Sequence, residues 1–143
     1  MIEIHQTLAS TAPPERLFAV LTDHRAMPRW FPPIRRVDLD PEGSPDPNGL
    51  GAVRKVHALG PPIVERVVEW EPPRRYVYVL EAGAPIRNHR GEVRVEAAPG
   101  GSKATWTITF APVIPGTGWL VRAVLTPAVV RMLRGAALLA EAG

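Results

Sequence analysis

The sequence of 143 residues contains no cysteine. This absence excludes a disulfide framework, a thiolate zinc site and a cysteine nucleophile. The four histidines are scattered at His5, His24, His57 and His89, and no two of them lie four residues apart on a predicted helix. Metal ions need several ligands at close spacing, so we expect neither a metal site nor another cofactor.

The sequence also lacks a concentrated run of one charge. The formal net charge of +3 comes almost wholly from arginine, which occurs singly or in pairs such as Arg35 and Arg36, among interspersed Asp and Glu. Nucleic-acid binding needs a basic stripe, so no nucleic-acid partner is expected. Residues 1–5 lack the basic start and apolar run of a secretory signal, and we therefore expect a cytoplasmic protein.

The chain has the length of one ordinary domain, which we expect to span residues 1–143. Residues 2–8 alternate apolar and polar side chains, a pattern that predicts a strand. Pro13, Pro14 and Glu15 then mark the start of a helix with an apolar face, and residues 26–33 predict a second, very short helix that proline ends.

From Arg35 the pattern changes to short β-rich runs separated by turn clusters at hairpin spacing. The loosest stretch, residues 42–49, is rich in Gly, Pro, Asp and Asn and predicts a surface loop. Together with the first strand, the runs predict an α+β protein with about seven strands, mostly in meander order. The six later runs are 37–39, 52–58, 63–70, 74–81, 92–97 and 104–110.

Residues 117–141 predict a long C-terminal helix, which would bend at Pro127 and Gly135. Most of its circumference is apolar, whereas a helix that lies on a sheet with one side in water needs only one apolar stripe. We therefore expect something to cover its other side. Arg122 and Pro127 interrupt the apolar run, so a transmembrane segment is not expected.

Alternation along the strands sorts side chains into two faces, and a slip of one residue would invert the assignment. In the hairpin of residues 52–58 and 63–70, we assign to the solvent the face where Glu65 and His57 form a surface pair. The outward set is Val53, Lys55, His57, Glu65, Val67 and Glu69. The inward set is Arg54, Val56, Ala58, Val64, Arg66, Val68 and Trp70.

The last hairpin divides more cleanly, because one of its faces consists of Arg94, Glu96, Lys103 and three threonines. Tyr76, Tyr78 and Leu80 share one face of the preceding strand, and we assign that face to the interior. His89 has the inward parity if its strand extends that far back. The inward residues of the last hairpin are Val93, Val95, Ala97, Ala104, Trp106, Ile108 and Phe110.

Two inward arginines admit two interpretations. A buried guanidinium needs an acid, water or the oxygen atoms of a ligand, so Arg54 or Arg66 could bind a carbonyl, phenolate or carboxylate of a guest. Alternatively, both side chains reach solvent through an open end of the sheet. Likewise, Trp70, Trp106 and Phe110 are either core residues or cavity walls, and His89 is either inert or a general acid or base.

Four segments resemble one known family. They are APPERLFAVLTD (12–23), MPRWFP (27–32), VVEWEPPRR (67–75) and GGSKATW (100–106), and they span most of the chain in the order strand, helix, short helix, meander and long helix. The chain resembles the polyketide cyclase/dehydrase group of the SRPBCC superfamily, which has the START-like or Bet v 1-like fold. The resemblance implies the helix-grip fold, a curved antiparallel sheet wrapped around the C-terminal helix with two short helices after the first strand.

The resemblance also implies a cavity between the sheet and the last helix, which different members use to cyclise polyketides or to carry lipids, quinones or hormones. Fold alone does not choose among these functions. In aromatase/cyclase members a pocket arginine with tyrosine and tryptophan orients the substrate, which makes Arg66, Tyr78 and Trp106 the nearest counterparts here. However, Trp70 stands where an arginine would be the natural alignment, which weakens the case for a cyclase.

We therefore carry three hypotheses. The first is binding of a hydrophobic or amphipathic small molecule, such as a lipid, quinone or polyketide, in the cavity. The second is a cyclase or dehydrase, with Arg66, Tyr78 and His89 as candidate catalytic residues. The third is an interaction module that dimerises, or docks on a membrane surface, through the apolar C-terminal helix. The candidate ligand-binding residues are Arg54, Val56, Arg66, Val68, Trp70, Tyr76, Tyr78, His89, Val95, Trp106, Ile108, Phe110 and Val124.

Overall fold

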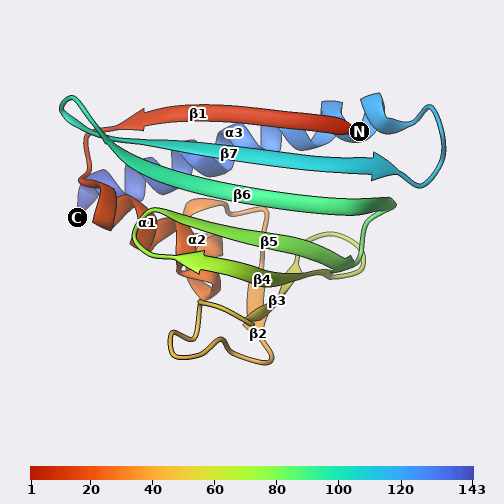
Figure 1. Cartoon of the computed structure of the whole chain (residues 1–143), viewed down its shortest axis with the longest axis horizontal. Helices are drawn as coiled ribbons and strands as arrows, with labels where there is room; N and C mark the ends of the chain where they lie inside the picture. Colours follow the sequence, from red (N-terminus) through yellow and green to blue (C-terminus); the bar gives the residue numbers. More distant parts are fainter.

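A computed structural model describes residues 1–143. A strand, two α-helices and a single turn of 3₁₀ helix come first, six strands follow, and one long helix ends the chain (Figure 1). The elements are β1 (Ile2–Ser10), α1 (Pro14–Thr22), the 3₁₀ helix (His24–Ala26), α2 (Met27–Trp30), β2 (Arg36–Leu39), β3 (Val53–His57), β4 (Ile63–Glu71), β5 (Arg75–Ala82), β6 (Ile86–Ala98), β7 (Gly101–Pro112) and α3 (Gly118–Ala142).

The strands form one antiparallel sheet in the order β1-β7-β6-β5-β4-β3-β2. Strands β2 to β7 are a continuous meander, and β1 returns to pair with β7 along nine residues. The sheet curves, and α3 lies across its concave side (Figure 1). The predicted seven strands, two short helices after the first strand and long terminal helix are confirmed.

Helix α3 is an integral part of this fold, because it packs along β1, β7, α1 and α2. By length and composition alone it could cross a membrane, with a mean hydropathy of 1.5 in its most apolar window, of which 28% is buried in the domain. Gly135 allows a close approach, since a Cβ there would collide with the backbone carbonyl oxygen of Trp30 in α2. At Gly135 the backbone of α3 therefore lies directly against the backbone of α2.

Strand β6 is longer than predicted, since it begins at Ile86 rather than near Glu92. The sequence does not predict this extension, because Arg87, Asn88 and Arg90 are polar and interrupt the alternation of apolar and polar residues. They surround an irregularity in the pairing with β7, where Asn88 adopts a positive φ of 54°. The extension makes His89 a strand residue with the inward orientation expected of it.

The face assignment of β4 is wrong over its first half. Arg54 of β3 pairs with Glu65 of β4, so Glu65 lies on the inner face and Arg66 on the outer face. The pairing with β5 then slips between Val67 and Glu69, and this β-bulge at Val68 returns Trp70 to the inner side. Strict alternation, which allows no bulge, therefore placed Glu65 and Val67 outward and Arg66 and Val68 inward, the reverse of what the structure has.

Candidate ligand-binding cavity

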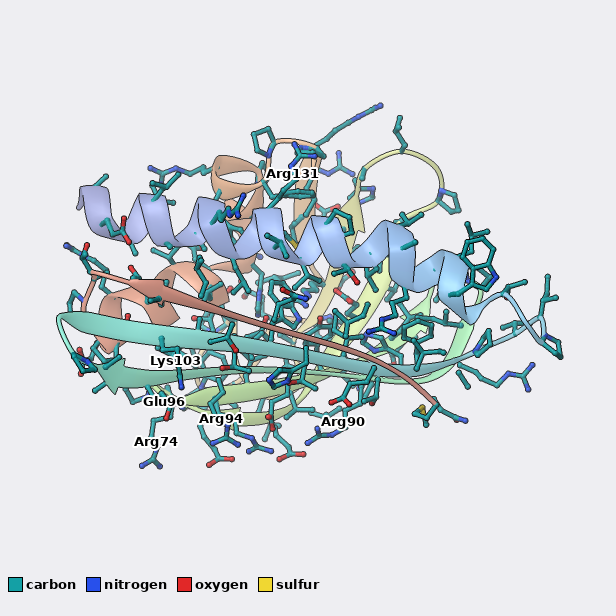
Figure 2. All side chains as sticks on the ribbon, turned by 90° about the horizontal axis from the view of Figure 1, so that it is seen from above. Arg74, Arg90, Arg94, Glu96, Lys103 and Arg131 are labelled. Atoms are coloured by element: carbon teal, nitrogen blue, oxygen red, sulfur yellow. The ribbon has the colours of Figure 1, made fainter.

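A cavity of about 260 Å³ lies between the concave face of the sheet and α3. The floor comes from β3 to β7, one wall from the segment that includes α2, and the roof from α3. Its surface is mostly aliphatic and aromatic, with Arg54, Glu65, Tyr78 and His89 as the polar groups that an adjoining guest would meet. Figure 2 shows the opposite arrangement on the convex face, where the labelled Arg90, Arg94, Glu96 and Lys103 point away from α3.

Six of the residues proposed from the sequence as ligand contacts line this cavity. They come from four strands of the sheet, and the structure brings them together around one space. Their inward orientation is confirmed, and their contact with a guest stays a prediction. They are Arg54, Val56, Tyr78, His89, Trp106 and Ile108.

The other proposed contacts lie elsewhere. Four of them face inward but lie away from the cavity, in the hydrophobic core or packed against it: Trp70, Tyr76, Val95 and Phe110. For Trp70 and Phe110 this agrees with the alternative that the inward aromatic residues are core residues. Phe18 of α1 lies against both Trp70 and Tyr76, with ring centroids 5.5 and 6.5 Å apart. This end of the domain is therefore closed by side chains.

Three proposed contacts point outward. The Arg66 side chain is 48% exposed, and its Nε donates to Glu81 at 3.0 Å on the outer face. Val68 is the exposed bulge residue, and Val124 is exposed on α3. His57, expected beside Glu65, instead lies 3.0 Å from the carboxylate of Asp38.

Sequence reasoning missed most of the walls that the helical segments supply. Met27 and Phe31 were assigned only to the short helix of residues 26–33, and Ile34 follows it without an assignment, so no signal gave their direction. The residues of α3 did carry a signal, because four of them recur at the spacing of one helical face. These four are Val121, Leu125, Val129 and Met132.

Arg54 is the centre of a buried polar network. Arg54 is only 2% exposed. Its Nε donates to Glu65 at 2.8 Å, and its Nη1 donates to His24 Nδ1 at 3.0 Å and to the Tyr76 hydroxyl at 3.1 Å. The guanidinium also lies 4.3 Å from the ring centroid of Tyr78. Burial opposes the charged form, but Tyr76 and Glu65 outweigh burial and raise the pKa of Arg54 above its ordinary value.

His24, from the 3₁₀ helix, is fully buried behind Arg54. Burial, and then the charge of Arg54, holds the pKa of His24 well below its usual value, so the imidazole is neutral near pH 7. Since a guanidinium can only donate, Nδ1 of His24 must be the acceptor, and Nε2–H then donates to the carbonyl oxygen of Asn48 at 3.0 Å. The network fixes one tautomer and holds the loop of residues 40–50 in place.

Three donors remain free at the cavity. Nη2 of Arg54 makes no hydrogen bond within the protein. Trp30 Nε1 is the only fully buried side-chain polar atom without a partner. Nη2 is therefore not fully enclosed and faces open space. The Tyr78 hydroxyl accepts from Trp106 Nε1 at 2.9 Å and has no acceptor for its own proton. His89 Nδ1 accepts from the backbone N–H of Leu80 at 3.0 Å, which leaves its Nε2–H free.

Gly91 makes room for Tyr78. The two residues are paired across β5 and β6, and a Cβ at position 91 would collide with the phenol ring. The ring therefore lies flat over the neighbouring strand, with its hydroxyl beside Trp106. A glycine opposite an inward tyrosine was a usable sequence signal, and it was not recognised.

The free groups suit binding better than proton transfer. Burial lowers the pKa of His89, and a protonated Nδ1 would meet the Leu80 N–H that now donates to it, so His89 is fixed as a neutral donor rather than a general base. Burial raises the pKa of Tyr78 well above its usual value, so the phenol keeps its proton. No group of three or more His, Asp or Glu side chains could hold a metal ion.

A curved sheet around a long helix, with an apolar cavity and a polar patch on its wall, defines the helix-grip class of ligand-binding folds. A profile of the family described as polyketide cyclase/dehydrase and lipid transport matches residues 1–140. The chain belongs to this family.

Solved structures agree with the fold. The aromatase/cyclase Zhui from a Streptomyces species has a TM-score of 0.83 and 21% identity, with 98% of this chain and 93% of that chain covered. Ara h 8.0201 has a TM-score of 0.77 and 20% identity, with 99% of both chains covered. These likenesses show the helix-grip, Bet v 1-like architecture.

Sequence relatives include an uncharacterised protein of Mycobacterium tuberculosis, which is 36% identical over 98 residues. The match covers 66% of this chain but 57% of the relative, so the chain spans little more than half the length of the curated relatives it matches.

Proposed function

We propose that this protein binds a small amphipathic molecule in the cavity, with an apolar body between the sheet and α3 and an uncharged oxygen end at Arg54, Tyr78 and His89. The observation that carries the proposal is the set of three unused donors on a mostly apolar wall. These donors have no acceptor in the protein, and a guest's carbonyl or hydroxyl oxygen would accept hydrogen bonds from them.

The charges of the wall argue for an uncharged oxygen. Arg54 is already neutralised by Glu65 at 2.8 Å, and Glu65 itself lines the cavity. A carboxylate guest would bring a second negative charge beside Glu65. A ketone, quinone or phenol avoids this repulsion and still accepts hydrogen bonds.

The size of the cavity limits the body of the guest. Ligand pockets usually enclose about 300–1,000 Å³, and this cavity of about 260 Å³ lies just below that range. We therefore expect a compound with one or two rings, or part of a longer chain whose remainder leaves through the mouth.

Naphthalene, a naphthol and a naphthoate test the proposal, because they share one apolar body and differ in oxygen. Titration calorimetry should show the naphthol binding about tenfold more tightly than naphthalene, as expected for one or two added hydrogen bonds. The naphthoate should bind less tightly than the naphthol. Equal affinity for naphthalene and the naphthol would contradict the proposed polar contact.

Two neighbouring tyrosines provide a matched pair of variants. Tyr78→Phe removes the hydroxyl of a tyrosine that lines the cavity, whereas Tyr76→Phe removes the hydroxyl of a core tyrosine that bonds only to Arg54. The preference for the naphthol should shrink in Tyr78→Phe and persist in Tyr76→Phe. If both variants lose the preference equally, the contact with Tyr78 is wrong.

Cyclase or dehydrase chemistry is a second candidate, favoured by the joint placement of Arg54 and Tyr78, which could stabilise an enolate oxygen. Arg66 takes no part, since it lies on the outer face, and the role of base would fall to Glu65. Turnover of a poly-β-ketone that survives unchanged in Glu65→Gln and Tyr78→Phe would remove this assignment.

A further inference from the structure

At one end of the molecule, three connections carry no charged side chain. Residues 58–62, 82–85 and 111–120 form three connections without a single Asp, Glu, Lys or Arg. They lie side by side, since the N–H of Val113 donates to the carbonyl oxygen of Pro85 at 3.2 Å and Gly83 lies against Pro62. Figure 1 shows the ends of β5 and β7 and the start of α3 together at this end. We call these residues the uncharged end.

The uncharged end exposes large apolar side chains. Leu59 is 86% exposed and Trp119 is 69% exposed, and Ile114 and Leu120 are exposed beside them in the chain. An apolar surface of this kind on a soluble fold marks a contact with a partner or a membrane. A tryptophan at such a place suits the boundary between headgroups and acyl chains, because its ring is apolar and its N–H is polar.

The charged residues that border this end include two arginines, and one acid, Glu3 of β1, which pairs with Thr109 of β7, also lies close by. Arg87 follows the second connection and donates to the carbonyl oxygen of Val113, and Arg122 lines a surface hollow with Trp119. Glu81, the nearest acid on β5, is paired with Arg66. The one acid of α3, Glu141, lies at the other end of the helix, where it accepts from Ser10.

This charge pattern favours an anionic surface over a second copy of the chain. Arg122 is exposed on α3 beside this end, and no free acid on that helix could oppose it across a twofold axis. Anionic phospholipid headgroups supply the missing negative charge. The apolar side chains would enter the outer part of the acyl region.

The uncharged end also borders the mouth of the cavity. Ala58, Ala84 and Val121 line the cavity and are partly exposed, and each belongs to or adjoins one of the three connections. We propose that this end docks on bilayers that contain anionic phospholipid and turns the mouth towards the acyl chains. Docking does not depend on the proposed function. Only the passage of a guest from the bilayer into the cavity rests on the proposed function.

Vesicles of phosphatidylcholine with and without phosphatidylglycerol test the docking. The intact protein should sediment with the anionic vesicles, and an ionic strength of about 1 M, where the Debye length is about 3 Å, should weaken the binding. Trp30 and Trp106 are buried, and Trp70 packs against the core beside Phe18 at the closed end, so a blue shift of tryptophan emission on binding should come mainly from Trp119 and be largely lost in Trp119→Phe.

Leu59→Asp and Trp119→Asp should each lower vesicle binding by about tenfold or more, since each replaces buried apolar contact with repulsion. Leu138→Asp is the matched control, because Leu138 is an equally apolar α3 residue that is 66% exposed far from the mouth. Thermal unfolding of all three variants establishes that they remain folded.

Several results would overturn the docking proposal. They are an absence of binding to anionic vesicles, an equal loss in Leu138→Asp, or a dimer in light scattering that Trp119→Asp dissociates. Binding of the naphthol by Trp119→Asp, measured without vesicles, separates the two proposals. A variant that keeps the guest but loses the vesicle affects docking alone, whereas Tyr78→Phe should bind the naphthol more weakly and still bind the vesicle.

Discussion

Arg54 shows how one charged side chain can be buried at the centre of this fold. Its three bonded N–H groups find Glu65, His24 and Tyr76, so the cost of leaving water is offset by directed hydrogen bonds. The remaining amino group is left for the cavity. Nε and Nη1 of the guanidinium thus hold the fold together, and Nη2 is the group proposed to bind a guest.

The neutral state of His24 leads to a prediction about pH. Its pKa in the folded protein is lowered by burial and by Arg54, so below its unfolded pKa of about 6.5 the unfolded chain takes up a proton that the folded protein refuses. Stability is therefore fully present above about pH 6.5 and falls as the pH is lowered. Denaturant unfolding between about pH 6.5 and pH 5 should show a loss of up to about 1.4 kcal/mol per pH unit.

His24→Gln is the variant that isolates this contribution, because an amide can accept from Arg54 and donate to Asn48 without titrating. Its unfolding free energy should depend less on pH over the same window. Identical slopes in the wild type and in His24→Gln would refute the assignment to His24.

At the scale of residues, the sequence predicted half of the polar site. Arg54, Tyr78 and His89 were placed inward by alternation, and the structure agrees. His24 lay in a break between two predicted helices, where no periodicity assigns a direction, so its contact with Arg54 could not be predicted. Glu65 was assigned outward because the error in β4 carried every residue before the bulge with it.

Among the secondary-structure elements, β4 shows why the alternation rule fails locally. A β-bulge inserts one residue, and its position depends on how the neighbouring strand pairs rather than on the composition of the bulged strand. β7 has a regular register with β1, and the irregularity in its pairing with β6, opposite Phe110, puts the extra residue in β6 rather than in β7, so Trp106, Ile108 and Phe110 were placed correctly. Fold class survived the error, because it depends on the number and order of strands.

The contact between α2 and α3 gives a prediction at this scale. Gly135→Ala should destabilise the protein by about 1–3 kcal/mol, because the added Cβ collides with the Trp30 carbonyl and forces the helices apart. Helix propensity alone predicts the opposite sign, a gain of up to about 1 kcal/mol. The sign of the change in denaturant unfolding therefore decides whether the close approach is real.

The molecule as a whole has a closed end, where α1 packs on Trp70 and Tyr76, and an open end around the cavity mouth. Filling the cavity should stabilise the entire fold, since the guest binds the native state only. With a naphthol at about one hundred times its dissociation constant, thermal unfolding should shift upward by about 5 to 10 °C. The Tyr78→Phe variant should show a smaller shift at the same concentration, and no shift in the wild type would argue against an accessible cavity.

Membership of the polyketide cyclase/dehydrase and lipid transport family follows from the match over residues 1–140. The single-domain organisation, the cytoplasmic location and dimerisation through α3 stay predictions.

The polar wall of the cavity and its mouth come from different kinds of structure, and this difference has a practical consequence for protein engineering. The polar donors stand on β3, β5 and β6, which are tied together by strand pairing, whereas the mouth is built from turns and the first part of α3. Turns tolerate insertions and substitutions that paired strands do not. Libraries that vary only residues 58–62 and 82–85 could therefore retune the shape of accepted guests while the oxygen-recognising wall is left intact, which makes this small domain a candidate scaffold for biosensors.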